Sequence, residues 1–202
     1  MKTTIALFQK LLIIASLSCM TLTSHSAGHG EKWNLSKNES KINFVSIKKG
    51  NIGEVHSFTQ FSGSIDHNQA NISIDTTSVD MLIPIRNERA LKYLFEADTF
   101  PTINIKSDIK TAINDSKKGT TMIKDIQASL SLHGITKDIT INVSITRNGK
   151  NSLTVSSAKP VIINAADFNM EAGIAKLGEL AGKIPVVTSV PVNFIMTFKR
   201  AT

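Results

Sequence analysis

The feature that most constrains this chain is an alternation of apolar and polar side chains with period two, repeated in successive segments. This period is typical of a β-strand with one face in a dry core and the other in water. Four apolar sets show it: Ile103, Ile105, Ile109 and Ile113; Met122, Ile126, Ala128, Leu130 and Leu132; Ile139, Ile141, Val143 and Ile145; and Val190, Val192, Phe194, Met196 and Phe198. We expect each set to face one common interior.

Short turn signals separate these segments and three further expected strands at 42–44, 55–65 and 70–78. The turns fall at residues 49–53, 66–69, 114–119, 133–134 and 147–150. Short connections favour antiparallel pairing of neighbouring strands. About eight such strands would leave open edges unless the sheet closes on itself. The sequence therefore predicts an all-β fold, a single antiparallel up-and-down β-barrel.

Two segments depart from period two and predict one or two short helices. Residues 87–95 carry Leu91, Leu94 and Phe95 at helical spacing, with Asn87 as the expected N-cap. Residues 171–180 place Ile174, Leu177 and Leu180 on one face. We expect both helices to pack against a mouth of the barrel. A helix that plugs the mouth and a helix that opens and closes it have the same sequence pattern.

The first 27 residues have the pattern of a secretory signal peptide, which predicts a periplasmic protein. Two basic residues, Lys2 and Lys10, precede an apolar stretch at 11–22 that is too short to span a bilayer comfortably. Small side chains follow, so cleavage is expected after Ser26 or after Ala27, with Ser26 slightly preferred. An uncleaved, membrane-anchored form and lipidation of Cys19 are the alternatives. Residues 28–202 show no linker and are interpreted as one domain.

Charge and cysteine content narrow the classes of partner. Without residues 1–27 the chain keeps 21 basic and 16 acidic residues, and the basic ones do not cluster. We therefore predict no nucleic-acid binding, whereas transient contact with an anionic membrane is compatible with the positive balance. The single cysteine, Cys19, lies in the signal peptide, so the domain has neither a disulfide nor a thiolate metal site.

An ordered set of short motifs resembles the YceI-like family of secreted bacterial proteins from Trp33 to Phe198. The motifs, in chain order, are Trp33 with the strand at 42–44, Phe-Thr-Gln-Phe-Ser-Gly-Ser-Ile at 58–65, Ser78-Val79 with Arg86 to Arg89 and Leu91, Phe95 to Ser107 with its Phe-Pro-Thr-Ile, Leu-Ser-Leu-His-Gly-Ile-Thr-Lys at 130–137, and Ala166 to Phe168. The resemblance implies a lipocalin-like barrel that holds a polyisoprenoid chain. Many members carry a histidine where this chain has Lys48-Lys49, so headgroup preference does not carry over from relatives.

The function that this resemblance implies is a periplasmic binding or carrier protein for a polyisoprenoid-type lipid, without catalysis or cofactor. The lipid would be a quinone, a quinone precursor or a polyprenyl chain. Each buried CH₂ contributes about 0.8 kcal/mol, so a purely apolar lumen suffices to hold it. The candidate wall residues are Phe44, Phe61, Leu91, Leu94, Phe95, Phe100, Ile103, Ile105, Leu132, Phe168, Phe194 and Met196. The same side chains would also suit a filled core.

Two other functions remain open from the sequence. An enzyme acting on an isoprenoid lipid would need polar groups at one barrel mouth, for which His133, Asp167 and Glu171 are the candidates. A filled barrel would serve as a stress-response or interaction module, with an exposed apolar patch in place of a cavity. A lipid tail that protrudes would favour a homodimer that covers it.

The histidines predict neither catalysis nor a metal site within the domain. His133 is expected to be a hydrogen-bonding residue of a tight turn, and its spacing from Ser131 and Asp138 does not suit a catalytic triad. His56 and His67 are expected at the surface beside turns. One exception lies at the new N-terminus, where cleavage after Ser26 would expose Ala27-Gly28-His29, a sequence suited to Cu(II) or Ni(II).

Overall fold

The computed structural model describes residues 32–110, 112 and 119–201. The predicted signal peptide, its cleavage site, Cys19 and the Ala27-Gly28-His29 sequence lie outside these residues. So do Ile113 and all but the last residue of the expected turn at 114–119. The division of the chain at residue 27 stays a prediction.

Twelve β-strands form one sheet in the described part of the chain, and every ladder in it is antiparallel. The strands are β1 (Trp33–Leu35), β2 (Lys41–Lys48), β3 (Ile52–Phe58), β4 (Phe61–Asp66), β5 (Gln69–Asp75), β6 (Val79–Asp80), β7 (Thr102–Asp108), β8 (Gly119–Leu132), β9 (Ile135–Arg147), β10 (Ser152–Ser157), β11 (Val161–Asn164) and β12 (Ser189–Arg200). Four consecutive pairs of these strands each run along one side of the same long neighbour. Both β1 and β2 pair with β12, as do β10 and β11; β4 and β3 pair with β1 and β2, and β5 and β6 pair with β4 and β3. The described residues thus make eight long strands, several of them bent.

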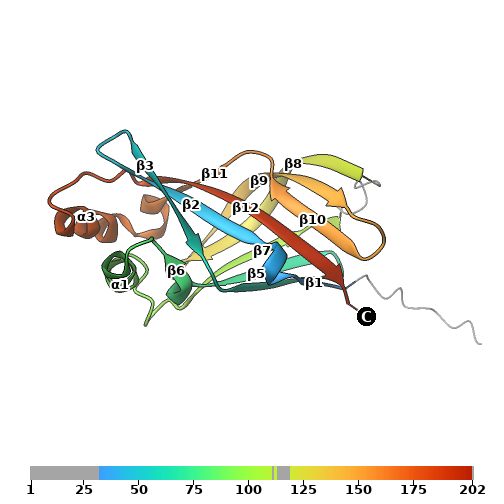
Figure 1. Ribbon diagram of the computed structural model, residues 1–202. Coiled ribbons are helices and arrows are strands. Elements are labelled where there is room, and N and C mark those ends of the chain that lie inside the picture. The colour runs from blue at the N-terminus through green and yellow to red at the C-terminus, as the bar shows by residue number, and fades with distance from the viewer. Residues whose placement is uncertain (1–31, 111, 113–118, 202) are drawn as a thin grey trace, which may run out of the picture.

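The sheet closes because β12 pairs along both of its edges. One edge contacts β10 and β11, and the other contacts β1 and β2, through partners such as Phe198 with Leu35 and Phe194 with Ile42. The first and last long strands therefore meet, and Figure 1 shows the resulting elongated barrel. The predicted all-β, antiparallel, up-and-down barrel is confirmed.

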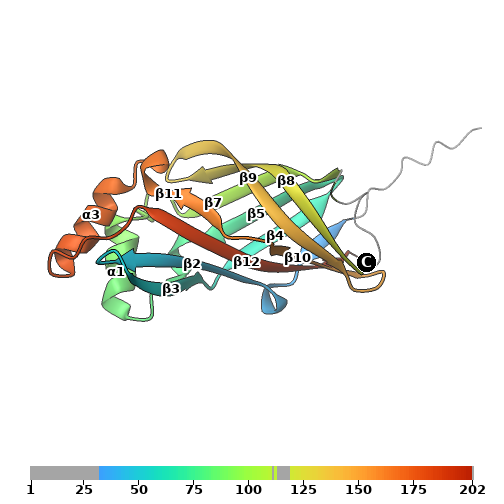
Figure 2. The ribbon, with the colours of Figure 1, turned by 90° about the horizontal axis from the view of Figure 1, so that it is seen from above.

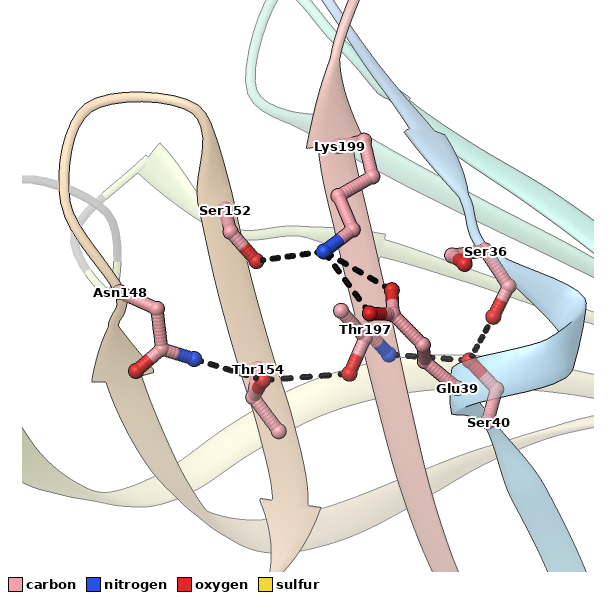
Figure 3. A network of polar contacts seen from close by, with 8 residues as sticks. All are labelled: Ser36, Glu39, Ser40, Asn148, Ser152, Thr154, Thr197 and Lys199. Atoms are coloured by element: carbon pink, nitrogen blue, oxygen red, sulfur yellow. Dashed lines mark hydrogen bonds and ion pairs between the residues drawn. The ribbon is translucent and has the colours of Figure 1, made fainter.

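A polar network fills the closing seam where β1 gives way to β2 (Figure 3). Residues 36–40 leave the ladder around a short 3₁₀ helix (Lys37–Glu39), so the neighbouring part of β12 has no strand partner on this edge, although its other edge still pairs with β10. The Ser36 amide donates to the Thr197 carbonyl at 2.7 Å, and the Ser40 hydroxyl accepts from the Thr197 amide at 3.0 Å. Buried backbone groups at a break in a ladder need such substitutes.

Both described α-helices, α1 (Pro84–Tyr93) and α3 (Glu171–Leu180), lie at the end of the barrel away from the C-terminus (Figure 2). They pack closely, since a Cβ added at Gly173 would lie 2.9 Å from the Leu94 Cα. The prediction for 171–180 is confirmed. The predicted N-cap was wrong: α1 begins at Pro84, and the Asn87 side chain instead accepts a hydrogen bond from the Met81 amide at 2.7 Å.

Two strand predictions also need correction. The expected strand at 55–65 is interrupted at Thr59-Gln60, where the chain passes from pairing with β6 to pairing with β5. Met122, expected on the inner face of β8, is 57% exposed. A register shift between Ile123 and Ile126, with Asp125 at φ 58°, turns the strand over, so Ile123 packs against the core in its place.

Candidate functional site

The barrel encloses a cavity of about 250 Å³. Its walls come from strands around the whole barrel, from α3 through Ile174, and from Leu94 and Phe95 after α1. All five alternating side chains of β12, from Val190 to Phe198, face it. The cavity therefore runs along the barrel interior and is covered at one end by the helices.

Ser107 supplies the one polar side chain in the described lining of this cavity. Its hydroxyl donates to the Gln127 carbonyl at 2.7 Å. Because that donor is already paired, it is not free to donate to a ligand. A guest inside this cavity is held by apolar contact.

Aromatic side chains concentrate where β2 and β3 approach the helices. Phe44 and Phe58 have ring centroids 5.4 Å apart, and Phe58 contacts Phe95 edge-on at 5.6 Å. All three line the cavity, whereas most of the remaining wall is aliphatic. The cavity thus has an aromatic end and an aliphatic body.

Eight of the twelve candidate wall residues line the cavity: Phe44, Leu94, Phe95, Ile103, Ile105, Leu132, Phe194 and Met196. Their contact with a lipid stays a prediction. The other four, Phe61, Leu91, Phe100 and Phe168, do not line it. Phe61 and Phe168 belong to the solid core, Leu91 packs against that core from α1, and Phe100 packs on Gly134 of the β8–β9 turn.

The candidate list omitted much of the aliphatic wall, including Ile72, Ile141, Val143, Leu153 and Val192. Strand alternation was the signal that marked many of the missing positions, because inward-facing residues of a closed barrel share one interior.

His133 occupies the β8–β9 turn with φ 51°, as the turn interpretation predicted. Its Nδ1–H donates to the Phe168 carbonyl at 3.1 Å, and its ring packs on Phe100 at 4.5 Å. Its Nε2 is buried without a hydrogen bond, 3.6 Å from the Glu96 carboxylate. The histidine therefore fastens the turn to the segment that precedes α3.

The other polar residues considered for catalysis have structural contacts of their own. Asp167 pairs with Lys137 at 3.3 Å, and the Ser131 hydroxyl hydrogen-bonds that of Thr136 at 2.6 Å. Glu171 is exposed at the start of α3. Ser131 and His133 do not hydrogen-bond each other, so the geometry gives no nucleophile–base pair at this turn.

His56 is only 1% exposed, and the surface position expected for it was wrong. It alternates with Phe58 on β3 and so faces inward. Its Nε2 hydrogen-bonds the Ser46 hydroxyl at 2.8 Å, whereas Nδ1 is buried without a partner. Burial lowers the pKa of the imidazole below its ordinary value. His67 is exposed, as expected.

A compact ion-pair group lies beside His56. Glu54 receives Lys48 at 2.7 Å and Arg86 of α1 at 3.0 Å, both on the same carboxylate oxygen. The hydrogen bond from Lys48 is the main cause of a lowered pKa at Glu54. These side chains are half-buried, so the pairs tie α1 to the β2–β3 hairpin.

Neither a metal cluster nor a membrane-spanning helix occurs among residues 32–110, 112 and 119–201. These residues contain no group of three His, Cys, Asp or Glu side chains placed to hold a metal ion. Within the same residues, every helix is too short and too polar to cross a membrane.

An antiparallel barrel closed around an apolar cavity has the lipocalin-like architecture. The model of the YceI-like domain family matches residues 33–198, and the chain belongs to that family. A solved polyisoprenoid binding domain from Saccharophagus degradans, implicated in plant cell wall breakdown, is 32% identical to this chain with a TM-score of 0.80. That match covers 86% of this chain and 100% of the other.

A second solved structure shares the fold. BcnA from Burkholderia cenocepacia is 22% identical, with a TM-score of 0.61, and the match covers 83% of this chain and 99% of BcnA. At this identity the likeness concerns the fold alone. A comparison with the curated proteins found no match.

Proposed function

We propose that this protein binds a polyisoprenoid-type lipid in the barrel cavity and carries it through the periplasm without chemical change. The observation that supports this most directly is the cavity itself, whose described lining is apolar apart from the internally bonded Ser107. Such a wall suits a long hydrocarbon chain and offers little to a polar metabolite.

The energetics fit a lipid tail. Each CH₂ removed from water contributes about 0.8 kcal/mol, and association and ordering costs reduce the total. The cavity, about 250 Å³, is slightly smaller than the usual range for small-molecule sites, about 300–1,000 Å³. A tail of tens of carbons therefore fills it and either widens the barrel or extends beyond it.

The class of lipid follows from the relative that is described as a polyisoprenoid binding domain. That domain is 32% identical over its whole length, and the same barrel holds the cavity here. A quinone, a quinone precursor or a polyprenyl chain all share this tail. We propose them as one ligand class.

The periplasmic location rests on the signal-peptide pattern of residues 1–27. A carrier in that compartment exchanges its lipid at a membrane surface, so transient membrane contact belongs to the proposal. A homodimer that covers a protruding tail is a second element of it.

The two alternatives have less support. For an enzyme at the β8–β9 end, Ser131, Asp167 and His133 already have structural partners, and Glu171 is exposed at the start of α3. A filled barrel predicts no cavity, whereas the described residues enclose one.

A chain-length series tests the proposal. Delipidated protein is titrated with isoprenols of increasing length, with displacement of an apolar fluorescent probe as the readout. Affinity is expected to rise with each added isoprene unit and then to level off once the cavity is full. Straight-chain fatty acids of equal carbon number serve as the control. An affinity independent of chain length would contradict the proposal.

A further inference from the structure

We propose that five side chains at the helix end of the barrel interior form the headgroup site of the carried lipid. They are Ser46, Lys48, Glu54, His56 and Arg86, here named the Glu54 cluster. The site takes an uncharged oxygen, a hydroxyl or a carbonyl, in preference to a phosphate. This inference rests on the proposed function and specifies the polar end of the ligand.

Strand alternation places the cluster in line with the cavity. Ile42 and Phe44 of β2 line the cavity, as does Phe58 of β3, and residues two apart in a strand share a face. Ser46 and Lys48 follow on the same face of β2. In the adjoining strand, His56 and Glu54 pair with Phe44 and Ser46 respectively. The polar residues thus continue the cavity wall toward the helices.

An unpaired polar atom in the cluster points to a missing partner. His56 is 1% exposed, and its Nδ1 has no hydrogen bond although Nε2 is bonded to Ser46. A buried polar atom without a partner costs free energy, on the order of 1–3 kcal/mol. A ligand oxygen at Nδ1 would remove that cost. In either imidazole tautomer a hydroxyl can pair with Nδ1, and a carbonyl pairs with the N–H form.

The neighbouring rings suit a headgroup that enters from the cavity. The imidazole lies 5.3 Å from the Phe44 ring, between centroids, and Phe44 lies 5.4 Å from Phe58. His56 is not itself part of the cavity lining, whereas Phe44 is. A headgroup therefore meets the imidazole beside Phe44 after that ring turns aside.

The charges of the cluster favour a neutral group. Lys48 and Arg86 both pair with one oxygen of Glu54, so their charge is directed at a carboxylate within the protein. The Asp80 carboxylate also interacts electrostatically with His56. Two cations, Lys48 and Arg86, and two anions therefore surround a histidine whose pKa is lowered by burial. A phosphate brought here would meet the Glu54 carboxylate and would have to displace it.

Three probes that share one isoprenoid tail test the headgroup site: the unmodified hydrocarbon, the tail on a hydroquinone ring, and the tail as a monophosphate. Each is titrated into the delipidated wild-type protein. The hydroquinone is expected to bind about tenfold more tightly than the hydrocarbon, the equivalent of one net hydrogen bond. The phosphate is expected to bind no more tightly than the hydrocarbon.

Two variants assign these differences to the cluster. Ser46→Ala combined with His56→Leu removes both hydrogen-bonding partners together, and it is expected to bring the ratio of hydroquinone to hydrocarbon affinity down to about one. His67→Leu changes an exposed histidine and is the matched control. Glu54→Gln releases Lys48 and Arg86 from the carboxylate, and is expected to raise phosphate affinity several-fold.

A measurement on the unmodified protein covers the case in which the double variant does not fold. In ¹⁵N spectra, the hydroquinone is expected to shift the Nδ1 resonance of His56, and the hydrocarbon is expected to leave it in place.

The outcomes distinguish failure of the headgroup site from failure of the proposed lipid-binding function. Equal affinity for all three probes, with no shift at His56, would overturn the headgroup site and leave the lipid-binding function standing. Tightest binding of the phosphate by the wild-type protein would overturn the preference for a neutral group. Failure of every probe, the hydrocarbon included, would reject the proposed function and the headgroup site with it.

Discussion

The Ser40 hydroxyl accepts a hydrogen bond from the Thr197 amide at 3.0 Å and donates one to the Ser36 carbonyl at 2.7 Å. This pair joins the first and last long strands at the point where the strand ladder is interrupted. Both residues are buried, so water does not replace the contact. Closure of the barrel at this seam therefore depends on a side chain as well as on backbone pairing.

Ser40→Ala should destabilise the barrel by about 1–3 kcal/mol, because the Thr197 amide would be left buried without an acceptor. Urea unfolding followed by circular dichroism measures the change. Ser62→Ala, at an exposed position on β4, is the control and should change stability by less than about 0.5 kcal/mol. Equal effects of the two substitutions would show that the seam hydrogen bond is unimportant.

Gly173→Ala should also destabilise the protein, by about 1–3 kcal/mol, because the added methyl group would overlap the backbone at Tyr93 and Leu94. Helix propensity alone predicts the opposite sign, a gain of about 1 kcal/mol. Ala172→Gly, at an exposed neighbouring site, should lose only the propensity. A thermal unfolding series separates the two explanations, and a Gly173→Ala variant more stable than wild type would refute close packing of α1 on α3.

Acidification should lower the free energy of unfolding below about pH 6.5, the ordinary pKa of histidine. Burial depresses the pKa of His56, so the unfolded chain binds a proton in a range where the folded chain does not. Glu54, whose pKa is also lowered, loses its contribution only at lower pH, below about 4.5. The two effects thus have the same sign and separate windows.

Urea titrations between about pH 7.5 and pH 5.5 measure the contribution of His56. His56→Gln should flatten the dependence on pH in this range even though it lowers stability overall. His67→Gln should keep the wild-type slope. An unchanged slope in His56→Gln would show that the imidazole is not held neutral by burial.

Adjacent positions on β11 allow a matched test of the cavity. Ile163 lines it, whereas Ile162 is 59% exposed. Ile163→Trp should fill part of the cavity and reduce affinity for an isoprenoid at least tenfold, with a stability change of about 1–3 kcal/mol. Ile162→Trp should bind as the wild type does. Equal binding by both variants would place the lipid outside the cavity.

The fold could be predicted from strand alternation because every second side chain of a strand points to the same face, as the apolar residues from Val190 to Phe198 do. Short turns then fixed antiparallel order, and an eight-stranded meander needs closure to avoid edges. A period-two pattern in the sequence does not reveal where a β-bulge interrupts the strand. The shift at Asp125 turned Met122 outward, and no residue in that stretch signals it, since Asp at positive φ is only an occasional feature of bulges.

The candidate site was harder to predict than the fold. Whether an inward side chain lines a cavity or fills a core depends on how tightly its neighbours pack, which the period-two pattern alone does not encode. Phe61 and Phe44 are equally buried, yet only Phe44 lines the cavity. His56 was assigned to the surface because histidine beside a turn is commonly exposed. Its alternation with Phe58, two residues further along the same strand, was the signal for an inward position.

Native mass spectrometry of the protein, purified from its source cells without detergent, shows whether a lipid occupies the barrel. Solvent extraction and fragmentation then identify whatever is bound. We expect a stoichiometric adduct that fragments in isoprene steps and carries an uncharged oxygen-bearing headgroup. A protein of apo mass that stays unchanged after incubation with quinones and polyprenols would contradict this expectation.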